Sequence, residues 1–184
     1  MKSALLLVLG LTLFVTASTW QVKQGDVRVM CPMTIGGTFE ATSTSLSGWV
    51  TASGDGSRPF DGSLAVNLRT LDTGIGLRNK HLRENYLEVE KGAGFDTATL
   101  SQIDLKGFTP EDLDGKGTFT GLLTLHGVTK SVTGTAEIHQ VGASLRVKAA
   151  FPVNLPDYSI AKPRYLGVGV KDTVQVEVAF LVSR

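Results

Sequence analysis

The amino-acid sequence predicts an all-β protein, an antiparallel β-barrel of about eight strands with one short amphipathic helix at its mouth. Apolar and polar residues alternate along most of the chain, and glycine-bearing turns separate the alternating segments. One charged stretch with helical periodicity interrupts them. Because each strand has one polar face and no helices alternate with the strands, we expect antiparallel pairing. Such strands must close or form a sandwich, and closure leaves no exposed edge.

The strands are assigned from period-two alternation, which is clearest in residues 131–139, 145–153 and 174–182. The earlier candidates are residues 21–30, 38–53, 60–70, 94–105 and 117–125. The inward-facing positions expected from these rows include Leu64, Val66, Leu68, Phe119, Leu123, Leu125, Val147, Ala149 and Phe151. In a barrel of this size, such side chains either fill the interior or enclose one small ligand.

The charged stretch, residues 76–90, predicts an amphipathic helix of three to four turns. Leu82, Tyr86 and Val89 recur at i, i+4 and i+7, and polar residues occupy the opposite face. Because the stretch lies between two strands, we expect it to cap or line the mouth of the barrel with its apolar row turned inward. The alternative is a plain packing helix that plugs an open end.

Residues 1–17 have the pattern of a secretory signal peptide. Lys2 precedes an apolar run over residues 4–15, and Val15 and Ala17 occupy the −3 and −1 positions of a cleavage site. The run is shorter than the roughly 20 apolar residues of a spanning helix, so no stable membrane span is expected in the mature form. We therefore expect one exported domain, residues 18–184, in the periplasm or secreted.

The charge balance bears on the class of partner. Cleavage removes Lys2, so Lys plus Arg falls from 18 to 17 against 17 Asp plus Glu. This balance argues against nucleic acid as a partner, which requires clustered cations, and against electrostatic docking on anionic lipid. The partner is expected to be uncharged or mostly apolar.

The sequence contains no recognisable catalytic or metal-binding motif, so we expect a protein that is not an enzyme and holds no metal. Cys31 is the only cysteine and is expected to be a buried small hydrophobe. The histidines lack metal-ligand spacing, and His126 and His139 are expected to be exposed. Two alternatives remain: a secreted barrel-fold enzyme or redox protein that uses Cys31 or His81, and a stress-induced adaptor.

Four motifs in order resemble the YceI-like family of polyisoprenoid-binding proteins, exported bacterial proteins with a lipocalin-like barrel. They are GGTF at 36–39, LDTG with RNKHLR at 71–74 and 78–83, GLLTLHGVTK at 121–130, and DYSI followed by Pro163 and LGV at 157–168. Asn79 replaces the usual aspartate, Ser131 stands where proline is common, and the proline that usually follows the helix is missing.

This resemblance implies an elongated apolar pore that binds the tail of an isoprenoid lipid, of the quinone or prenyl phosphate type, for carriage, storage or stress response. No cofactor is implied besides this bound lipid. Each candidate for lipid binding is also an ordinary core or rim residue on the sequence alone. The candidates are Leu64, Val66, Leu68, Leu82, Tyr86, Val89, Phe119, Leu123, Leu125, Val147, Phe151, Tyr158 and Tyr165.

The mouth is where a polar head group would lie. A tyrosine offers an apolar body and a polar tip, which makes the three tyrosines among the candidates suitable for the mouth. Arg78, His81 and Arg83 are candidates for an anionic head group near the helix start. A homodimer is also considered, because the valine-rich last strand would pair with a second copy if it lay at an edge.

Overall fold

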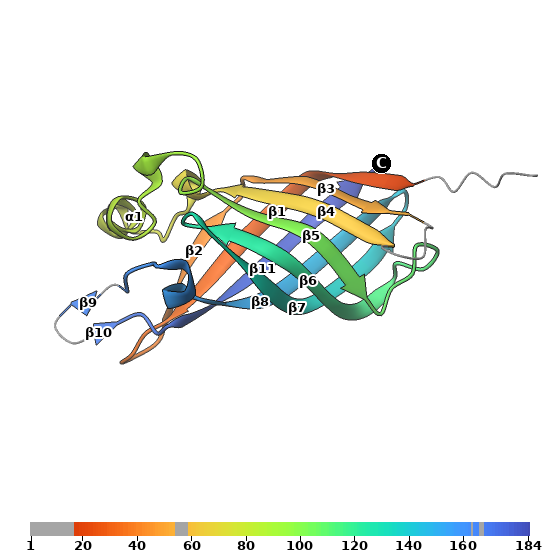
Figure 1. Cartoon of the computed structure of the whole chain (residues 1–184). Coiled ribbons are helices and arrows are strands. Elements are labelled where there is room, and N and C mark those ends of the chain that lie inside the picture. The colour runs from red at the N-terminus through yellow and green to blue at the C-terminus, as the bar shows by residue number, and fades with distance from the viewer. Residues whose placement is uncertain (1–16, 54–58, 163, 166–167) are drawn as a thin grey trace, which may run out of the picture.

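The computed structural model describes residues 17–53, 59–162, 164–165 and 168–184. A closed antiparallel β-barrel dominates it (Figure 1). The wall consists of β1 (Ser18–Pro32), β2 (Thr38–Ser43), β3 (Leu46–Ala52), β4 (Phe60–Asn67), β5 (Thr97–Lys106), β6 (Gly115–Leu125), β7 (Val128–Val141), β8 (Ser144–Asn154) and β11 (Thr173–Ser183). From β3 to β8 each strand pairs with the next along the chain, β1 pairs with both β2 and β3, and β11 pairs with both β8 and β1. The last strand therefore has a neighbour on each side.

Strands β2 and β3 together occupy one position in the wall. They pair with the same edge of β1 in one continuous register, with Val27 opposite Ser43 and Gln21 opposite Trp49. The predicted barrel of about eight strands is thus confirmed, with one strand interrupted. The interruption arises because the Ser43 hydroxyl accepts a hydrogen bond from the Ser45 backbone N–H at 3.1 Å and lies 2.6 Å from the Thr70 hydroxyl. Such local bonds compete with the strand ladder.

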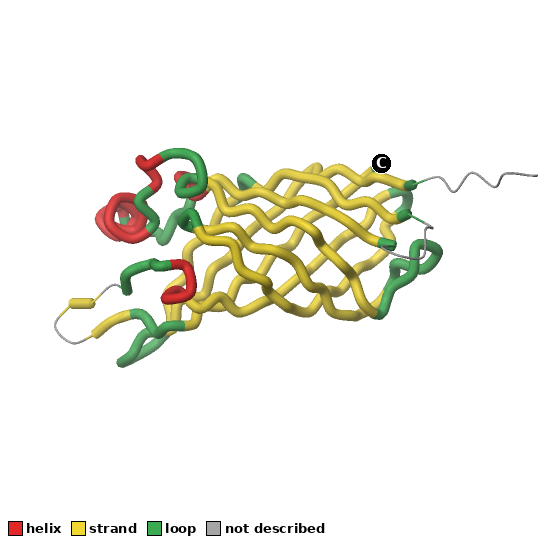
Figure 2. The backbone as a smooth tube through the Cα atoms, in the orientation of Figure 1, coloured by secondary structure: helices red, strands yellow, loops and turns green. Residues whose placement is uncertain are grey.

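The helical turns of the described chain gather at one end of the barrel, which we call the mouth (Figure 2). They are η1 (Leu68–Thr70), α1 (Gly76–His81), η2 (Leu82–Tyr86), η3 (Val89–Lys91) and η4 (Leu155–Tyr158), and the short strands β9 (Arg164–Tyr165) and β10 (Val168–Gly169) lie beside them. The opposite end carries residues 107–114, the turn at residues 142–143, and the described ends of the chain near Ser18 and Arg184 (Figure 1). We call this the far end.

The predicted helix at residues 76–90 is present but shorter and irregular. It runs as α1 and then as the π-helical turn η2, in which the Leu87 N–H donates to the Leu82 carbonyl at 2.9 Å. Glu88 then adopts a left-handed conformation at φ 50°, which ends the helix. Val89 consequently lies in the separate turn η3, where it is almost fully buried.

Residues 1–16 lie outside the described part, so the signal peptide stays a prediction. Among the described residues, no helix is both long and apolar enough to span a bilayer.

Candidate functional site

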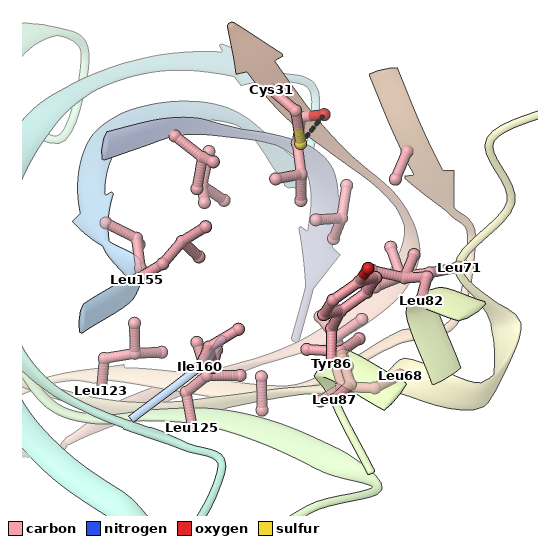
Figure 3. A pocket seen from close by; sticks show the side chains of 18 of the residues that line it. Cys31, Leu68, Leu71, Leu82, Tyr86, Leu87, Leu123, Leu125, Leu155 and Ile160 are labelled. Carbon is pink, nitrogen blue, oxygen red and sulfur yellow. Dashed lines mark hydrogen bonds between the residues drawn. The ribbon is translucent and has the colours of Figure 1, made fainter. Parts of the chain in front are cut away.

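An apolar cavity of about 180 Å³ lies inside the barrel at the mouth (Figure 3). Strand side chains form its wall, and side chains from the helical turns close its outer part. Cys31 and Tyr86 are the lining residues that carry a polar side-chain atom. The full lining is Val27, Val29, Cys31, Phe39, Ala41, Leu46, Leu64, Val66, Leu68, Leu71, Leu82, Tyr86, Leu87, Ala98, Leu100, Leu123, Leu125, Phe151, Val153, Leu155, Ile160, Ala161, Val170, Val174, Val176 and Val178.

A second apolar cavity, of about 70 Å³, lies deeper in the barrel, toward the far end. Phe119, Val147 and Ala149 are among its lining residues. The two cavities share four lining residues, Leu64, Leu100, Phe151 and Val178, which we call the collar. The barrel interior therefore holds two apolar cavities in succession, and the collar lies between them.

The aromatic part of the collar depends on a glycine. Phe119 lies opposite Gly134 across the β6–β7 ladder, and its ring meets the Phe151 ring edge-on, with centroids 5.6 Å apart. A Cβ atom at Gly134 would lie 2.6 Å from the Phe119 ring and 2.8 Å from the Phe151 Cβ. Gly134 thus leaves room for the Phe119 ring and for the Phe151 Cβ atom beside the backbone of β7.

Three side chains of the helical segment, Leu82, Tyr86 and Leu87, line the cavity at the mouth (Figure 3). Leu82 and Tyr86 were identified from the helical period. Leu87 was not, because it comes five residues after Leu82, and only the π-helical turn brings that spacing onto one face. Its single sequence signal was its apolar character.

The opposite side of the mouth comes from the segment after β8. Leu155 and Ile160 line the cavity there (Figure 3). The Leu155 N–H donates to the Asp172 carbonyl at 2.8 Å, and the Ile160 N–H donates to the Leu155 carbonyl at 3.2 Å. Sequence reasoning missed both residues, since a short turn shows no periodic pattern.

A buried polar link joins the two sides of the mouth. His126, in the β6–β7 turn, is 9% exposed, so the prediction that it would be exposed is wrong. Its Nε2 lies 2.9 Å from Glu88 Oε2 and its Nδ1 lies 3.0 Å from the Tyr158 carbonyl oxygen. The carboxylate and the carbonyl are both acceptors, so the ring lies between two hydrogen-bond acceptors. Phe95 covers the ring edge-on at 4.7 Å.

His139 is exposed, as predicted. Hydrogen bonds to Glu137 and then to Asp114 raise the pKa of its ring above the ordinary value.

Cys31 lines the cavity and is buried, as predicted. Burial raises the pKa of its thiol to about 11. Its Sγ points to the Val29 carbonyl at 3.9 Å (Figure 3). The thiol therefore stays protonated at neutral pH.

The predicted head-group residues lie around the mouth, outside the lining of both cavities. The Arg78 guanidinium lies over the Phe39 ring at 4.5 Å, and Arg83 Nη2 donates to the Leu71 carbonyl at 2.9 Å. His81 is exposed. These contacts engage both guanidinium groups, although Arg83 Nε is buried without a hydrogen-bond partner among the described residues. The role of both arginines toward a head group stays a prediction.

Most predicted lipid-binding residues line the void. Val89 and Tyr158 are buried outside the lining of both cavities, at 1% and 2% exposure. Tyr165 has a described backbone, but its side chain lies outside the described part. The lining residues are Leu64, Val66, Leu68, Leu82, Tyr86, Phe119, Leu123, Leu125, Val147 and Phe151. Within the described ranges, no group of three or more His, Cys, Asp or Glu side chains is placed to hold a metal ion.

Comparison with known proteins assigns the family. Residues 15–181 match the model of the YceI-like domain. The chain belongs to the YceI-like family. This confirms the resemblance seen in the sequence motifs.

Curated relatives match part of this YceI-like chain. A UPF0312 protein from Enterobacter sp. (strain 638) is 40% identical over 93 residues, 46% of this chain and 44% of that protein. A UPF0312 protein from Vibrio vulnificus (strain YJ016) is 39% identical over 84 residues, 44% of this chain and 39% of that protein. The matched part of the chain spans less than half the length of these curated relatives.

Solved structures share the fold of the YceI-like chain. Burkholderia cenocepacia BcnA has a TM-score of 0.67 at 17% identity, with 85% of this chain and 95% of that chain covered. A polyisoprenoid binding domain from Saccharophagus degradans has a TM-score of 0.65 at 16% identity, with 89% and 97% covered. At these identities the likeness establishes a common barrel fold.

Proposed function

We propose that this YceI-like chain is an exported binding protein, periplasmic or secreted, that holds the apolar tail of an isoprenoid lipid inside its barrel. The observation that carries the proposal is the elongated void behind Leu82, Tyr86 and Leu87, lined almost entirely by carbon. The lipid is of the quinone or prenyl phosphate type, and its binding serves carriage, storage or a stress response.

The apolar lining favours burial of a hydrocarbon tail. Burial gains about 0.8 kcal/mol per CH₂, so the roughly six carbons of a benzene-sized space gain about 5 kcal/mol before the costs of association. An apolar cavity of about 150 Å³ stays dry and accepts a benzene-sized ligand. The cavity of about 180 Å³ at the mouth therefore accommodates the end of a tail, and the rest extends through the mouth.

The polarity of the mouth supports an orientation with the tail inward and the head group outward. Tyr86 presents the phenol among the lining side chains, whereas Arg78 and Arg83 lie outside the lining. The Saccharophagus degradans domain, which is described as polyisoprenoid binding, shares this barrel. The raised pKa of Cys31 weighs against the alternative of a redox enzyme, because a thiol needs its thiolate form to react.

Extraction tests the proposal. Protein purified from its native host is treated with solvent, and the extract is analysed by mass spectrometry for a prenyl lipid. We expect a prenyl lipid in near-stoichiometric amount. An empty extract together with turnover that depends on Cys31 would replace this proposal with the enzyme alternative.

A filled-cavity variant adds a matched control. Ala98→Phe places a ring into the void, because Ala98 lines it, and we expect at least a tenfold loss of extracted lipid. Ala179→Phe makes the same change at an exposed position of β11 and should keep the lipid. If both variants carried the same amount, the lipid would be bound elsewhere.

A further inference from the structure

Four large apolar side chains are exposed on the described surface: Ile35 at 67%, Leu77 at 65%, Ile75 at 49% and Val141 at 44%. Three of them, Ile35, Ile75 and Leu77, belong to mouth segments, and we call these three the mouth rim. Val141 ends β7 beside the turn at residues 142–143, at the far end of the barrel (Figure 1). Three of these four exposed side chains therefore lie at the end of the barrel that holds the larger cavity.

The mouth rim belongs to chain segments that also supply residues of the cavity wall. Ile35 lies in the chain between Cys31 and Phe39, which both line the cavity. Ile75 and Leu77 lie between the lining residues at positions 71 and 82. The Arg78 guanidinium lies over the Phe39 ring at 4.5 Å, so α1, which follows Ile75, contacts the start of β2. The segment around Ile35 bonds instead to the β10 side of the mouth, where the Thr34 N–H donates to the Gly169 carbonyl at 2.7 Å.

An end of this chain and a second copy of it are both less suited than a membrane to cover the mouth rim. The described ends of this chain leave the barrel at the far end (Figure 1), away from the rim. A stable dimer buries about 1,200 Å² or more in total, far beyond what three side chains supply. A bilayer surface, by contrast, takes up a few protruding aliphatic side chains at its interface.

We propose that the mouth rim docks the protein on a lipid bilayer, with Ile35, Ile75 and Leu77 inserted and the cavity opening toward the membrane. The formal net charge of the sequence is only +1, but Arg78 and Lys80 follow Leu77 in α1, so the test must separate apolar docking from electrostatic docking. The purpose of the docking would be to transfer an apolar tail between bilayer and barrel without exposing it to water, and this purpose rests on the proposed function. The docking itself requires no cargo.

Vesicle flotation tests the docking. The purified protein is mixed with vesicles of phosphatidylcholine, a zwitterionic lipid, and we expect it to float with them at about 0.1 M and at about 1 M salt alike. Ile35→Ser and the double change Ile75→Ser with Leu77→Ser should each lower the partition coefficient, by about tenfold per side chain removed. Val141→Ser removes a comparable exposed side chain at the far end and should float like the unchanged protein.

Several results would overturn the docking: no flotation of the unchanged protein, equal flotation of the rim variants, an equal loss in Val141→Ser, or loss of binding at high salt. Rim variants that turn a dimer into a monomer in sedimentation, with no vesicle binding by either form, would also overturn it. Loading with a prenyl alcohol dispersed in detergent is measured separately. Failed loading with intact flotation would contradict the proposed function and leave the docking standing.

Discussion

Glu88 and His126 lie 38 residues apart and meet side chain to side chain at 2.9 Å, and both have left-handed backbones, at φ 50° and 52°. A non-glycine residue in this conformation costs about 1–2 kcal/mol, so the surrounding contacts must hold both in place. Through its other nitrogen, His126 also holds the Tyr158 carbonyl. One imidazole thereby connects the helical side of the mouth, the β6–β7 turn and η4.

Replacement of His126 by alanine should destabilise the protein measurably. The change removes the ring and leaves the buried Tyr158 carbonyl without its donor, which costs about 1–3 kcal/mol in the free energy of unfolding. Denaturant titration measures the loss. His139→Ala removes an exposed histidine and should stay within about 0.5 kcal/mol of the unchanged protein. Equal effects of the two changes would show that the link at the mouth contributes nothing.

The same link predicts an acid dependence. Hydrogen bonds, first from Lys91 and then from His126, lower the pKa of Glu88 below its ordinary value of 4.5. A carboxylate with a lowered pKa in the folded state stabilises the protein above pH 4.5, and this contribution is lost as the pH falls through the folded pKa. Unfolding free energies measured from pH 6 downward, about three pH units, should therefore fall more steeply for the unchanged protein than for Glu88→Gln. Parallel curves would contradict the prediction.

Asn79 stands where the family usually has aspartate, and the structure explains why this chain needs the amide. Its Nδ2 donates to Asp72 Oδ1 at 2.6 Å, while its Oδ1 accepts from the Thr73 N–H at 2.7 Å. Asn79→Asp would set two carboxylates against each other, so we expect a lower thermal midpoint at pH 7. The exchanged pair, Asp72→Asn with Asn79→Asp, should recover most of the loss. A double variant no better than the single one would refute this account.

The strand pattern was predictable because alternation along a strand is local. Each β-strand residue either faces the interior or the solvent, so rows such as Leu123 and Leu125 reveal their orientation without knowledge of the partner strands. The helical period is also a local pattern, and it placed Leu82 and Tyr86 at the mouth. Closure into a barrel followed from the need to cover strand edges.

What escaped prediction depends on contacts distant in sequence. His126 was expected to be exposed because it precedes a turn glycine, yet its partners lie 32 and 38 residues away. Leu87 joined the cavity through a π-helical turn, and Ile160 through a non-periodic segment. The break between β2 and β3 comes from hydroxyl contacts that include Thr70, 27 residues from Ser43. No local period carries such information.

The burial of Cys31 predicts an unreactive thiol. With its pKa raised to about 11, roughly one thiol in a thousand is ionised at pH 8, so native alkylation should be about 100-fold slower than that of a free cysteine. Iodoacetamide labelling followed by mass spectrometry measures the rate, and the unfolded protein provides the reference. Labelling in the native state at the unfolded rate would show a reactive thiol and revive the redox alternative.

Phe151 is expected to limit the length of tail that enters the barrel. It lines both cavities, so Phe151→Ala should join them into one void and shift preference toward longer prenyl chains. The substitution should also cost about 3–5 kcal/mol of stability, as for other buried rings. Competition between prenyl alcohols of different length, followed by extraction, measures the preference.

Phe108 provides the matched control for this prediction. It is 8% exposed and lines neither cavity. Phe108→Ala should therefore lower stability by a comparable amount and leave the length preference unchanged. Phe151→Leu keeps much of the buried volume and should give an intermediate preference if the alanine variant does not fold. An unchanged preference in both Phe151 variants would show that the collar does not set tail length.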